Sequence, residues 1–274
     1  MCKKNPQVLY HYCSLETFYK IIKNHTLRFS DIIKSNDSEE ILFTINCYIN
    51  YLKKKYDEKL PIHMFEYEIY KVVDTIKFYT FCMSSKKDLL SQWKGYAPNG
   101  GVAIGFNFEK LKQYIKDSVI LRSKIKLEKL NYIDKNNPEK LNKKFDKWDN
   151  SSPFDNIENL LSLSVLNKNK GFEEECEYRM YFENFEKINI ANQPIPKVRV
   201  GNHKPCEIDF SINNNDLKSY FDIPFTFDLI DEIIIRPKLN ITEEILQSFL
   251  FRYDTDKEID FNKLKIETTK LSYR

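Results

Sequence analysis

A run of charged residues late in the chain has the residue types and the spacing of a catalytic site. Glu175, Glu177 and Arg179 alternate with apolar residues, so a strand over residues 175–182 would place all three on one face. Two carboxylates about 7 Å apart, with an arginine beyond them, suit a site that holds a hydroxyl group and a developing positive charge. Because neighbouring carboxylates raise each other's pKa and an arginine lowers it, one carboxylate can act as a general base and the other as an electrostatic stabiliser.

The same pattern is typical of an ordinary amphipathic strand. In that interpretation the alternate residues from Cys176 to Phe182 face the core, the charged side faces water, and Arg179 is only the structural partner of a glutamate. The spacing alone leaves both interpretations open.

The composition excludes several classes of protein. The chain has 274 residues, a formal net charge of +3, and 14% aromatic residues, which argues against intrinsic disorder. It has only 6 glycines and neither G-x-G-x-x-G nor G-x-x-x-x-G-K-[ST], so the dinucleotide fingerprint and the P-loop are both excluded. No apolar stretch approaches the roughly 18 residues of a membrane span, and no secretory signal follows Met1. We therefore expect a cytoplasmic protein that does not cross a membrane.

The cysteines and histidines do not indicate a metal site. The 6 cysteines are widely scattered, which is typical of reduced thiols in an intracellular protein. The close pairs His11 with Cys13 and His203 with Cys206 lack the spacing of a structural zinc site, and no H-E-x-x-H occurs. We expect no metal bound by these residues.

The elements that must position the charged run are short strands, irregularly interleaved with helices. Hydrophobic periodicity and turn residues predict strands at residues 8–12, 26–30, 77–83, 102–106, 119–133, 175–182, 198–200, 207–210, 229–235 and 264–273. They predict helices at residues 15–24, 41–49, 88–96, 108–116, 157–167 and 242–253. No linker divides this pattern, so we expect one α+β domain over residues 1–274, with a short-stranded mixed or antiparallel sheet. Residues 108–170 would form a helical, lysine-rich insertion in it, with residues 134–150 exposed.

Charge is unevenly distributed around this insertion. Residues 109–147 contain 12 basic and 6 acidic residues, a net charge of +6. Such a segment can follow a phosphate backbone, but the alternation of basic and acidic residues favours a solvated face.

Short motifs spread through nearly the whole chain carry a family resemblance. They are residues 9–14 (LYHYCS), 27–30 (LRFS), Asn36, Asp37, Glu40, 81–84 (FCMS), Trp93, Tyr96, 101–106 (GVAIGF), Lys168, Phe172, Glu175, Glu177, Arg179 and 231–237 (DEIIIRP). In this order they resemble the bacterial family known as domain of unknown function 2971.

The layout of that family is similar to that of ADP-ribosyltransferases. Those enzymes carry His or Arg on a first strand, Ser or Tyr on a middle strand and E-x-E or a lone Glu on a late strand; the corresponding residues here are His11, Ser84 and Glu175-x-Glu177. The resemblance implies an ADP-ribosyltransferase-like fold and an enzyme that takes NAD as its substrate, cleaves the nicotinamide–ribose bond and transfers ADP-ribose to a macromolecular acceptor, either protein or nucleic acid. It also suits a toxin or phage-defence effector with a neutralising partner.

The resemblance also implies roles for individual residues. Glu177 would stabilise the ribose cation and hold its 2′-hydroxyl, Glu175 would activate the acceptor as a general base, and His11 would hold the adenosine-side ribose. The other expected binding residues are Tyr12, Trp93 and Tyr96 for ring stacking, Arg28 for the pyrophosphate, and Ser84 and Arg179. Each has a structural alternative: His11 as a hydrogen-bonded strand residue, Trp93 as core, and Arg28 as the partner of Asp31 or Asp37.

Two other functions stay open at this point. The first is a metal-dependent nuclease in which Asp37, Glu40, Glu175 and Glu177 bind Mg²⁺ and Lys168 or Lys170 lies near the phosphate. The second is a non-catalytic module whose aromatic residues hold a nucleotide or a protein partner.

Overall fold

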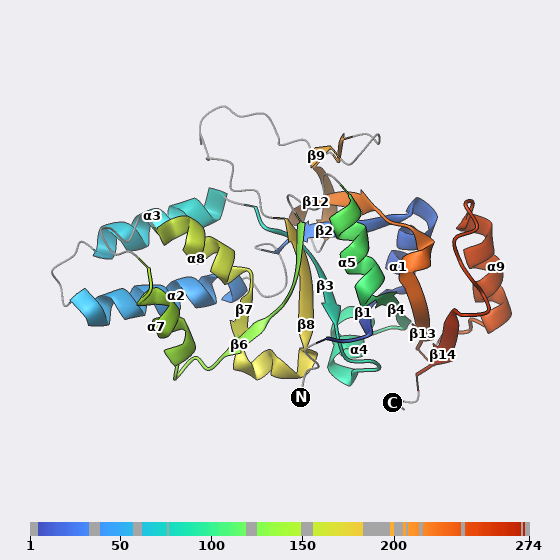
Figure 1. The fold of residues 1–274 in the computed structure, drawn as a ribbon, viewed down its shortest axis with the longest axis horizontal. Helices are drawn as coiled ribbons and strands as arrows, with labels where there is room; N and C mark the ends of the chain where they lie inside the picture. The colour runs from blue at the N-terminus through green and yellow to red at the C-terminus, as the bar shows by residue number, and fades with distance from the viewer. Residues whose placement is uncertain are drawn as a thin grey trace.

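The computed structural model describes residues 5–32, 39–56, 62–75, 77–118, 125–148, 156–182, 198–199, 205–206, 208–213, 216–236, 239–269 and 271. Within these residues the main feature is a 10-stranded mixed sheet with helices packed around it (Figure 1). The expected α+β class with a mixed sheet is therefore confirmed.

The sheet is antiparallel except at one edge. Its strand order is β11-β12-β2-β3-β1-β4-β13-β14, and only the last pair, β13 with β14, is parallel. The strands of this path are β1 (Val8–Ser14), β2 (Thr26–Asp31), β3 (Tyr79–Ser84), β4 (Gly101–Asn107), β11 (Asp209–Asn213), β12 (Asp216–Pro224), β13 (Ile230–Ile235) and β14 (Lys265–Thr268).

Strand β3 is the branch point of the sheet. It pairs with β8 (Glu177–Phe182) from Thr80 to Ser84, and β8 pairs in turn with β5 (Ile125–Lys129). Strand β3 also pairs with β2. Its pairing with β1 consists of one residue pair, Tyr10 opposite Ser84. The strand with the candidate glutamate thus lies next to the middle of the main sheet.

Among the described residues, four short strands lie outside this sheet. A parallel pair is formed by β6 (Asn131–Ile133) and β7 (Asn167–Asn169), and an antiparallel pair by β9 (Val198–Arg199) and β10 (Pro205–Cys206).

The helices gather at the two ends of the molecule. Helices α2, α3, α7 and α8 lie together at one end, and α1, α5 and α9 lie toward the other (Figure 1). The helices are α1 (Leu15–Asn24), α2 (Glu39–Tyr56), α3 (Ile62–Thr75), α4 (Leu90–Tyr96), α5 (Phe108–Asp117), α7 (Glu139–Phe145), α8 (Ile157–Ser164) and α9 (Glu243–Tyr253), with two 3₁₀ helices, η3 (Lys170–Glu175) and η4 (Phe227–Leu229).

Each end has its own hydrophobic core. The sheet core is made by strands such as β4 and β13 together with α1, α5 and α9, and includes Met180 of β8. The helical core is made by α2, α3, α7 and α8, and includes Tyr181 of β8. Neighbouring residues of β8 therefore pack into different cores, which places this strand between the two.

Within residues 108–170, the structure differs from the helical insertion with an exposed segment that the sequence predicts. Strand β5 joins the main sheet through β8, and α7 buries Leu141 and Phe145 in the helical core, although residues 134–150 were expected to be exposed. Phe145 contacts the rings of Tyr48 and Trp148, which holds this segment against α2.

The expectation of reduced cysteines holds for some thiols only. Cys13, Cys47 and Cys82 are free, whereas Cys176 is disulfide-bonded. No helix among the described residues is long and apolar enough to span a membrane.

Candidate active site

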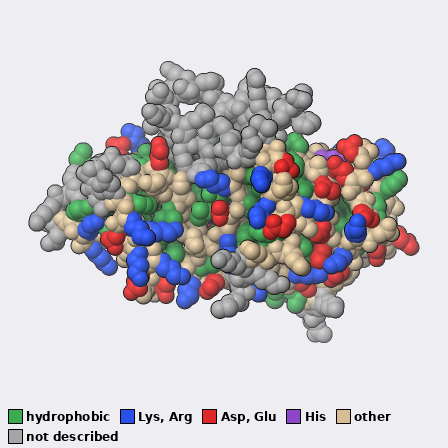
Figure 2. All heavy atoms as spheres, in the orientation of Figure 1, with side chains coloured by type: hydrophobic (Ala, Val, Ile, Leu, Met, Phe, Trp, Pro, Cys, Tyr) green, Lys and Arg blue, Asp and Glu red, His purple; other side chains and the backbone are tan. Residues whose placement is uncertain are grey.

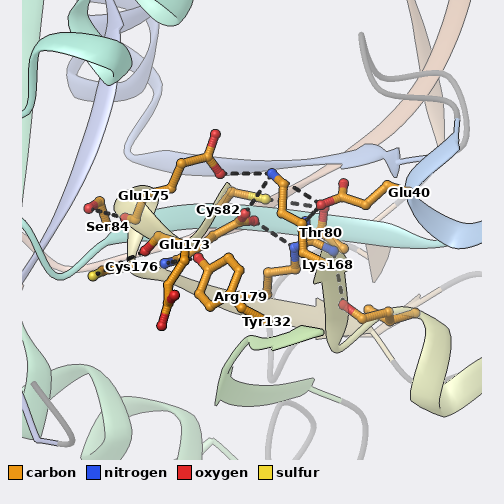
Figure 3. A network of polar contacts seen from close by, with 12 residues as sticks. Glu40, Thr80, Cys82, Ser84, Tyr132, Lys168, Glu173, Glu175, Cys176 and Arg179 are labelled. Atoms are coloured by element: carbon orange, nitrogen blue, oxygen red, sulfur yellow. Dashed lines mark hydrogen bonds and ion pairs between the residues drawn. The ribbon is translucent and has the colours of Figure 1, made fainter. Parts of the chain in front are cut away.

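The charged side of β8 is buried. Glu177 is 6% exposed and Arg179 is 1% exposed, so the interpretation of an amphipathic strand with a wet charged side is wrong. Helix α2 and strand β7 cover this side: Glu40 of α2 and Lys168 of β7 both reach the charged groups of β8 (Figure 3).

The strand is shorter than the sequence pattern predicts. Glu175 ends the 3₁₀ helix η3, and Cys176 adopts a left-handed conformation with φ 45°, so β8 begins only at Glu177. The two glutamates therefore do not share a strand face. Lys168 brings their carboxylates together instead, because its Nζ lies 2.8 Å from Oε2 of Glu175 and 3.1 Å from Oε2 of Glu177.

Lys168 and Arg179 form a network with three carboxylates. Lys168 also lies 3.1 Å from Oε1 of Glu40. Arg179 donates from Nε to Oε1 of Glu177 and from Nη2 to Oε1 of Glu40, both at 2.6 Å, and from Nη1 to the Val165 carbonyl at 2.9 Å. All three nitrogens of Arg179 are thus used within the protein, so its role is to position Glu177 and Glu40.

The network fixes the charge states of its members. Burial alone would raise the pKa of Glu177, but the charges of Arg179 and Lys168 outweigh burial and lower it to about 2. Burial opposes the charge of Lys168, yet the carboxylates of Glu177, Glu40 and Glu175 raise its pKa well above the ordinary value. Burial raises the pKa of Glu175 despite its contact with Lys168. Glu177 is therefore a permanent anion, and Glu175 is the better proton acceptor of the pair.

A cavity of about 50 Å³ lies beside this network. Six of the residues expected at the site line it: His11, Tyr12, Ser84, Tyr96, Glu175 and Glu177. They come from β1, β3, α4, η3 and β8, which are far apart in the sequence. Gln92, Cys82 and Met83 complete the lining.

His11 is a neutral hydrogen-bonding residue in this cavity. Its Nδ1 lies 2.9 Å from the Cys82 carbonyl oxygen, so Nδ1 carries the proton and Nε2 has the free lone pair. The ring stacks on Phe81 with centroids 4.3 Å apart. Burial lowers the pKa of His11 to about 4, against the opposing effect of the bond to Cys82, so the imidazole is uncharged near neutral pH.

Ser84 holds the backbone at Glu175, the last residue of η3. Its Oγ donates to the Glu175 carbonyl at 2.6 Å and accepts from the Lys86 amide at 3.0 Å. The hydroxyl proton is therefore already used within the protein, and Ser84 fixes where Glu175 stands.

The expected aromatic binding residues separate into two groups. Tyr96 lines the cavity and is half exposed, so its ring is accessible. Tyr12 lines the cavity but is buried; its hydroxyl donates to the Lys86 carbonyl and accepts from the Leu89 amide. Trp93 is 1% exposed, packs edge-on against Tyr12 and donates to Asp88, so the expected ring stacking of Trp93 with a ligand is wrong in this conformation.

Arg28 lies outside the cavity. Both ends of its guanidinium bind Asp222, at 3.0 Å each, and the group lies 3.4 Å from the centroid of the Tyr220 ring. Its bidentate face is thus filled by a carboxylate of β12, which corrects the expectation that Arg28 is free to meet a pyrophosphate. Asn36 and Asp37 lie outside the described residues.

The spacing along β8 alone does not place Glu40 and Lys168 with Glu177. Arg179 and Glu40 are separated by 139 positions in the chain, and no local sequence pattern predicts a contact over such a distance. Two signals grouped them: both are among the family-like motifs, and the nuclease hypothesis named Glu40 as a metal ligand with Glu175 and Glu177 and put Lys168 near the phosphate. Among the described residues no group of three or more His, Cys, Asp or Glu residues is arranged to hold a metal ion, and the Lys168 ammonium takes the place between the carboxylates.

A comparison with known protein families tests the resemblance to the family of unknown function that the sequence motifs indicate. The family described as "Protein of unknown function (DUF2971)" matches residues 92–180, which include most of α4, Lys168 and most of β8. The resemblance to this family is confirmed. No curated protein and no solved structure matches the chain.

Proposed function

We propose that this DUF2971-like chain is an ADP-ribosyltransferase-like enzyme that cleaves the nicotinamide–ribose bond of NAD and transfers ADP-ribose to a macromolecular acceptor. One observation carries the proposal: His11, Ser84, Tyr96 and Glu177 line the same cavity, and Glu177 is held there as a buried anion. A toxin or defence effector with a neutralising partner is the biological role that this activity would suit.

Glu177 supplies the main electrostatic effect. The bond between ribose and nicotinamide breaks with its electron pair leaving on nicotinamide, and positive charge develops on the sugar. A carboxylate that stays ionised stabilises that charge without reorganising, because Arg179 and Lys168 already fix its position at 2.6 Å and 3.1 Å.

Glu175 acts on the acceptor nucleophile, and His11 binds the sugar. Glu175 has the raised pKa of a general base and can take the proton of the acceptor nucleophile as that nucleophile bonds to the sugar carbon. The free Nε2 of His11 can accept a hydrogen bond from a sugar hydroxyl, since Nδ1 is committed to Cys82. Tyr96 offers an accessible ring for stacking on a base.

The size of the cavity limits which part of the substrate these residues hold. About 50 Å³ admits a few small groups, whereas whole ligands take roughly 300–1,000 Å³. The lining residues fit the hydroxyl-bearing sugar next to the scissile bond, and the rest of the dinucleotide must lie outside. The position of Lys168 between the three carboxylates favours this chemistry over a metal-dependent nuclease.

The test is release of nicotinamide from NAD by the purified chain in the presence of a chelator. Glu177→Gln keeps the shape of the side chain and is expected to lower turnover about 10²–10³-fold, the usual effect of removing one preorganised group. The matched control is Glu232→Gln, because Glu232 is also buried and ion-paired, with Lys87 at 3.0 Å, but lies outside the cavity. Wild-type turnover in Glu177→Gln, or cleavage of nucleic acid that requires a divalent metal, would contradict the proposal.

A further inference from the structure

A second and larger cavity lies on the other side of η3, between β6 and α7. It has a volume of about 380 Å³ and is lined in part by Lys129, Tyr132, Lys140, Lys144, Asn167 and Glu173. We call these six residues the lysine cleft. None of the six lines the smaller cavity at Glu177.

The lysine cleft concentrates positive charge on one helix. Lys140 and Lys144 are four positions apart on α7, so both ammonium groups stand on the same helix face. Both are exposed, and neither has an ion pair with any residue that the structure describes. Like charges at this spacing destabilise a helix unless an anion lies between them. Lysine side chains gather over α7 in Figure 2. Glu173 is the single acidic member of the cleft.

A buried amide oxygen in the cleft needs a donor. Asn167 has no exposed surface; its Nδ2 donates to the Leu163 carbonyl at 2.8 Å, and its Oδ1 has no hydrogen-bond partner within the described part of the chain. Leaving a buried acceptor unsatisfied costs about 1–3 kcal/mol, and Asn167 lines the cavity, so a ligand there that carries an N–H or O–H group would satisfy this oxygen.

The cleft continues into a shallower hollow that has the same character. This hollow shares Lys144 and adds Lys126, Lys147, Trp148 and Tyr181. Lys126 of β5 and Lys144 of α7 therefore share the hollow with the half-buried ring of Trp148, whereas Tyr181 is buried in the helical core. A combination of lysines and an accessible aromatic ring is typical of surfaces that hold single-stranded nucleic acid, where cations meet the backbone and rings stack on bases.

We propose that the lysine cleft binds a phosphorylated nucleoside unit. Lys140 and Lys144 meet its phosphate, and Oδ1 of Asn167 accepts a hydrogen bond from its base or sugar. The volume of about 380 Å³ suits one such unit. The unit can come from a single strand of RNA, which would extend along the shallower hollow, or from a free nucleotide. This inference does not depend on the NAD chemistry at Glu177.

The experiment is a binding titration of the full chain with a short, fluorescently labelled single-stranded RNA, in the absence of NAD. Lys140→Gln with Lys144→Gln is expected to weaken binding at least about tenfold and to reduce the slope of log K against log salt by about 0.7 for each lysine. The control is Lys71→Gln with Lys116→Gln, which removes the same charge from exposed positions on α3 and α5 and is expected to keep wild-type affinity.

Two further measurements identify the source of the ligand and test the role of Asn167. Competition by a nucleoside monophosphate would identify a free nucleotide as a sufficient ligand, and a requirement for the strand would identify RNA; either supports the cleft. Asn167→Asp is expected to weaken binding because it puts negative charge at the cleft, and its melting temperature shows whether the fold persists. No binding of RNA or nucleotide at low salt, or equal losses in the two double-lysine variants, would overturn the proposal.

Discussion

The charge state of Glu177 depends on the charged side chains around it. Three carboxylates meet two cations in a region where every member is largely buried, and each cation contacts more than one carboxylate. Such a network holds its members in one geometry. The energetic contributions of its members cannot be separated, because removing one ion leaves the charges of the others uncompensated. Glu175 lies at the edge of the network, where its carboxylate can exchange a proton while Glu177 stays charged.

Replacing Lys168 tests this interdependence. Lys168→Met is expected to lower the free energy of unfolding by about 3–5 kcal/mol at neutral pH, because Glu40 and Glu177 would then share only Arg179 and Glu175 would lose the cation that it contacts. The deficit should shrink as pH falls and Glu175, whose pKa is already raised by burial, takes up a proton. Denaturant titrations at several pH values measure it. Lys20→Met, which breaks an exposed pair with Glu16, is the control and should leave stability nearly unchanged. Equal losses in the two variants would mean that the buried network adds nothing.

His11 makes a separate, pH-dependent contribution to stability. Its pKa falls from 6.5 to about 4 on folding, so between these values the unfolded chain binds more protons than the folded one. The free energy of unfolding should therefore drop as pH falls from about 6.5 to about 4, by about 3 kcal/mol in total. His11→Phe should flatten the curve in this window, as measured by denaturant titrations across it. An unchanged slope in His11→Phe would show that the imidazole is not buried in its neutral form.

At the level of elements, strands with strong local patterns were predictable. Residues 102–106 are all apolar or glycine and form the core of β4, and Ser14 caps α1 as its residue type indicates, accepting from the Thr17 amide. Helix α3 is absent from the expected elements, although Ile62, Phe65, Ile69 and Val73 recur at helical spacing and are buried.

The candidate site was predictable only in part. The residues His11, Ser84 and Glu177 could be named from family-like motifs, but Glu175 was misplaced on the strand, because the left-handed turn at Cys176 is set by tertiary contacts. The partners of Arg28 and Arg179 stand on β12 and α2, 194 and 139 positions away in the chain, and such pairings leave no periodic signal.

The start of β4 depends on the absence of a side chain at Gly101. A Cβ there would lie against the Cys13 carbonyl oxygen and 2.5 Å from Cβ of Ala97, so it would push β4 away from β1 and α4. Gly101→Ala is expected to lower the free energy of unfolding by about 1–3 kcal/mol, as overpacking does. Gly95→Ala in α4 meets nothing within 4 Å and should raise it by about 0.5–1 kcal/mol. Chemical denaturation of both variants measures the difference, and a neutral Gly101→Ala would contradict the packing argument.

Across the whole molecule, strand β8 connects two hydrophobic cores. Met180 and Tyr181 are adjacent on β8, yet the first packs with the sheet core and the second with the helical core. The ion network crosses the same boundary, because Glu40 of α2 binds Arg179 of β8. The helical end therefore supplies part of the geometry at Glu177, and loosening it should disturb the site even where no site residue is changed.

A pair of neighbouring substitutions measures this coupling. Tyr181→Ala and Met180→Ala each delete a buried side chain and should each lower the free energy of unfolding by about 2–5 kcal/mol. Hydrogen exchange should then separate them: Tyr181→Ala should raise exchange mainly in α2, α7 and α8, and Met180→Ala mainly in β4, β13 and α1. Because Glu40 stands on α2, Tyr181→Ala should also loosen the carboxylate network and lower NAD turnover more than its loss of stability explains. If both variants raise exchange equally across the molecule, the two cores unfold as one unit and the strand is not a boundary between them.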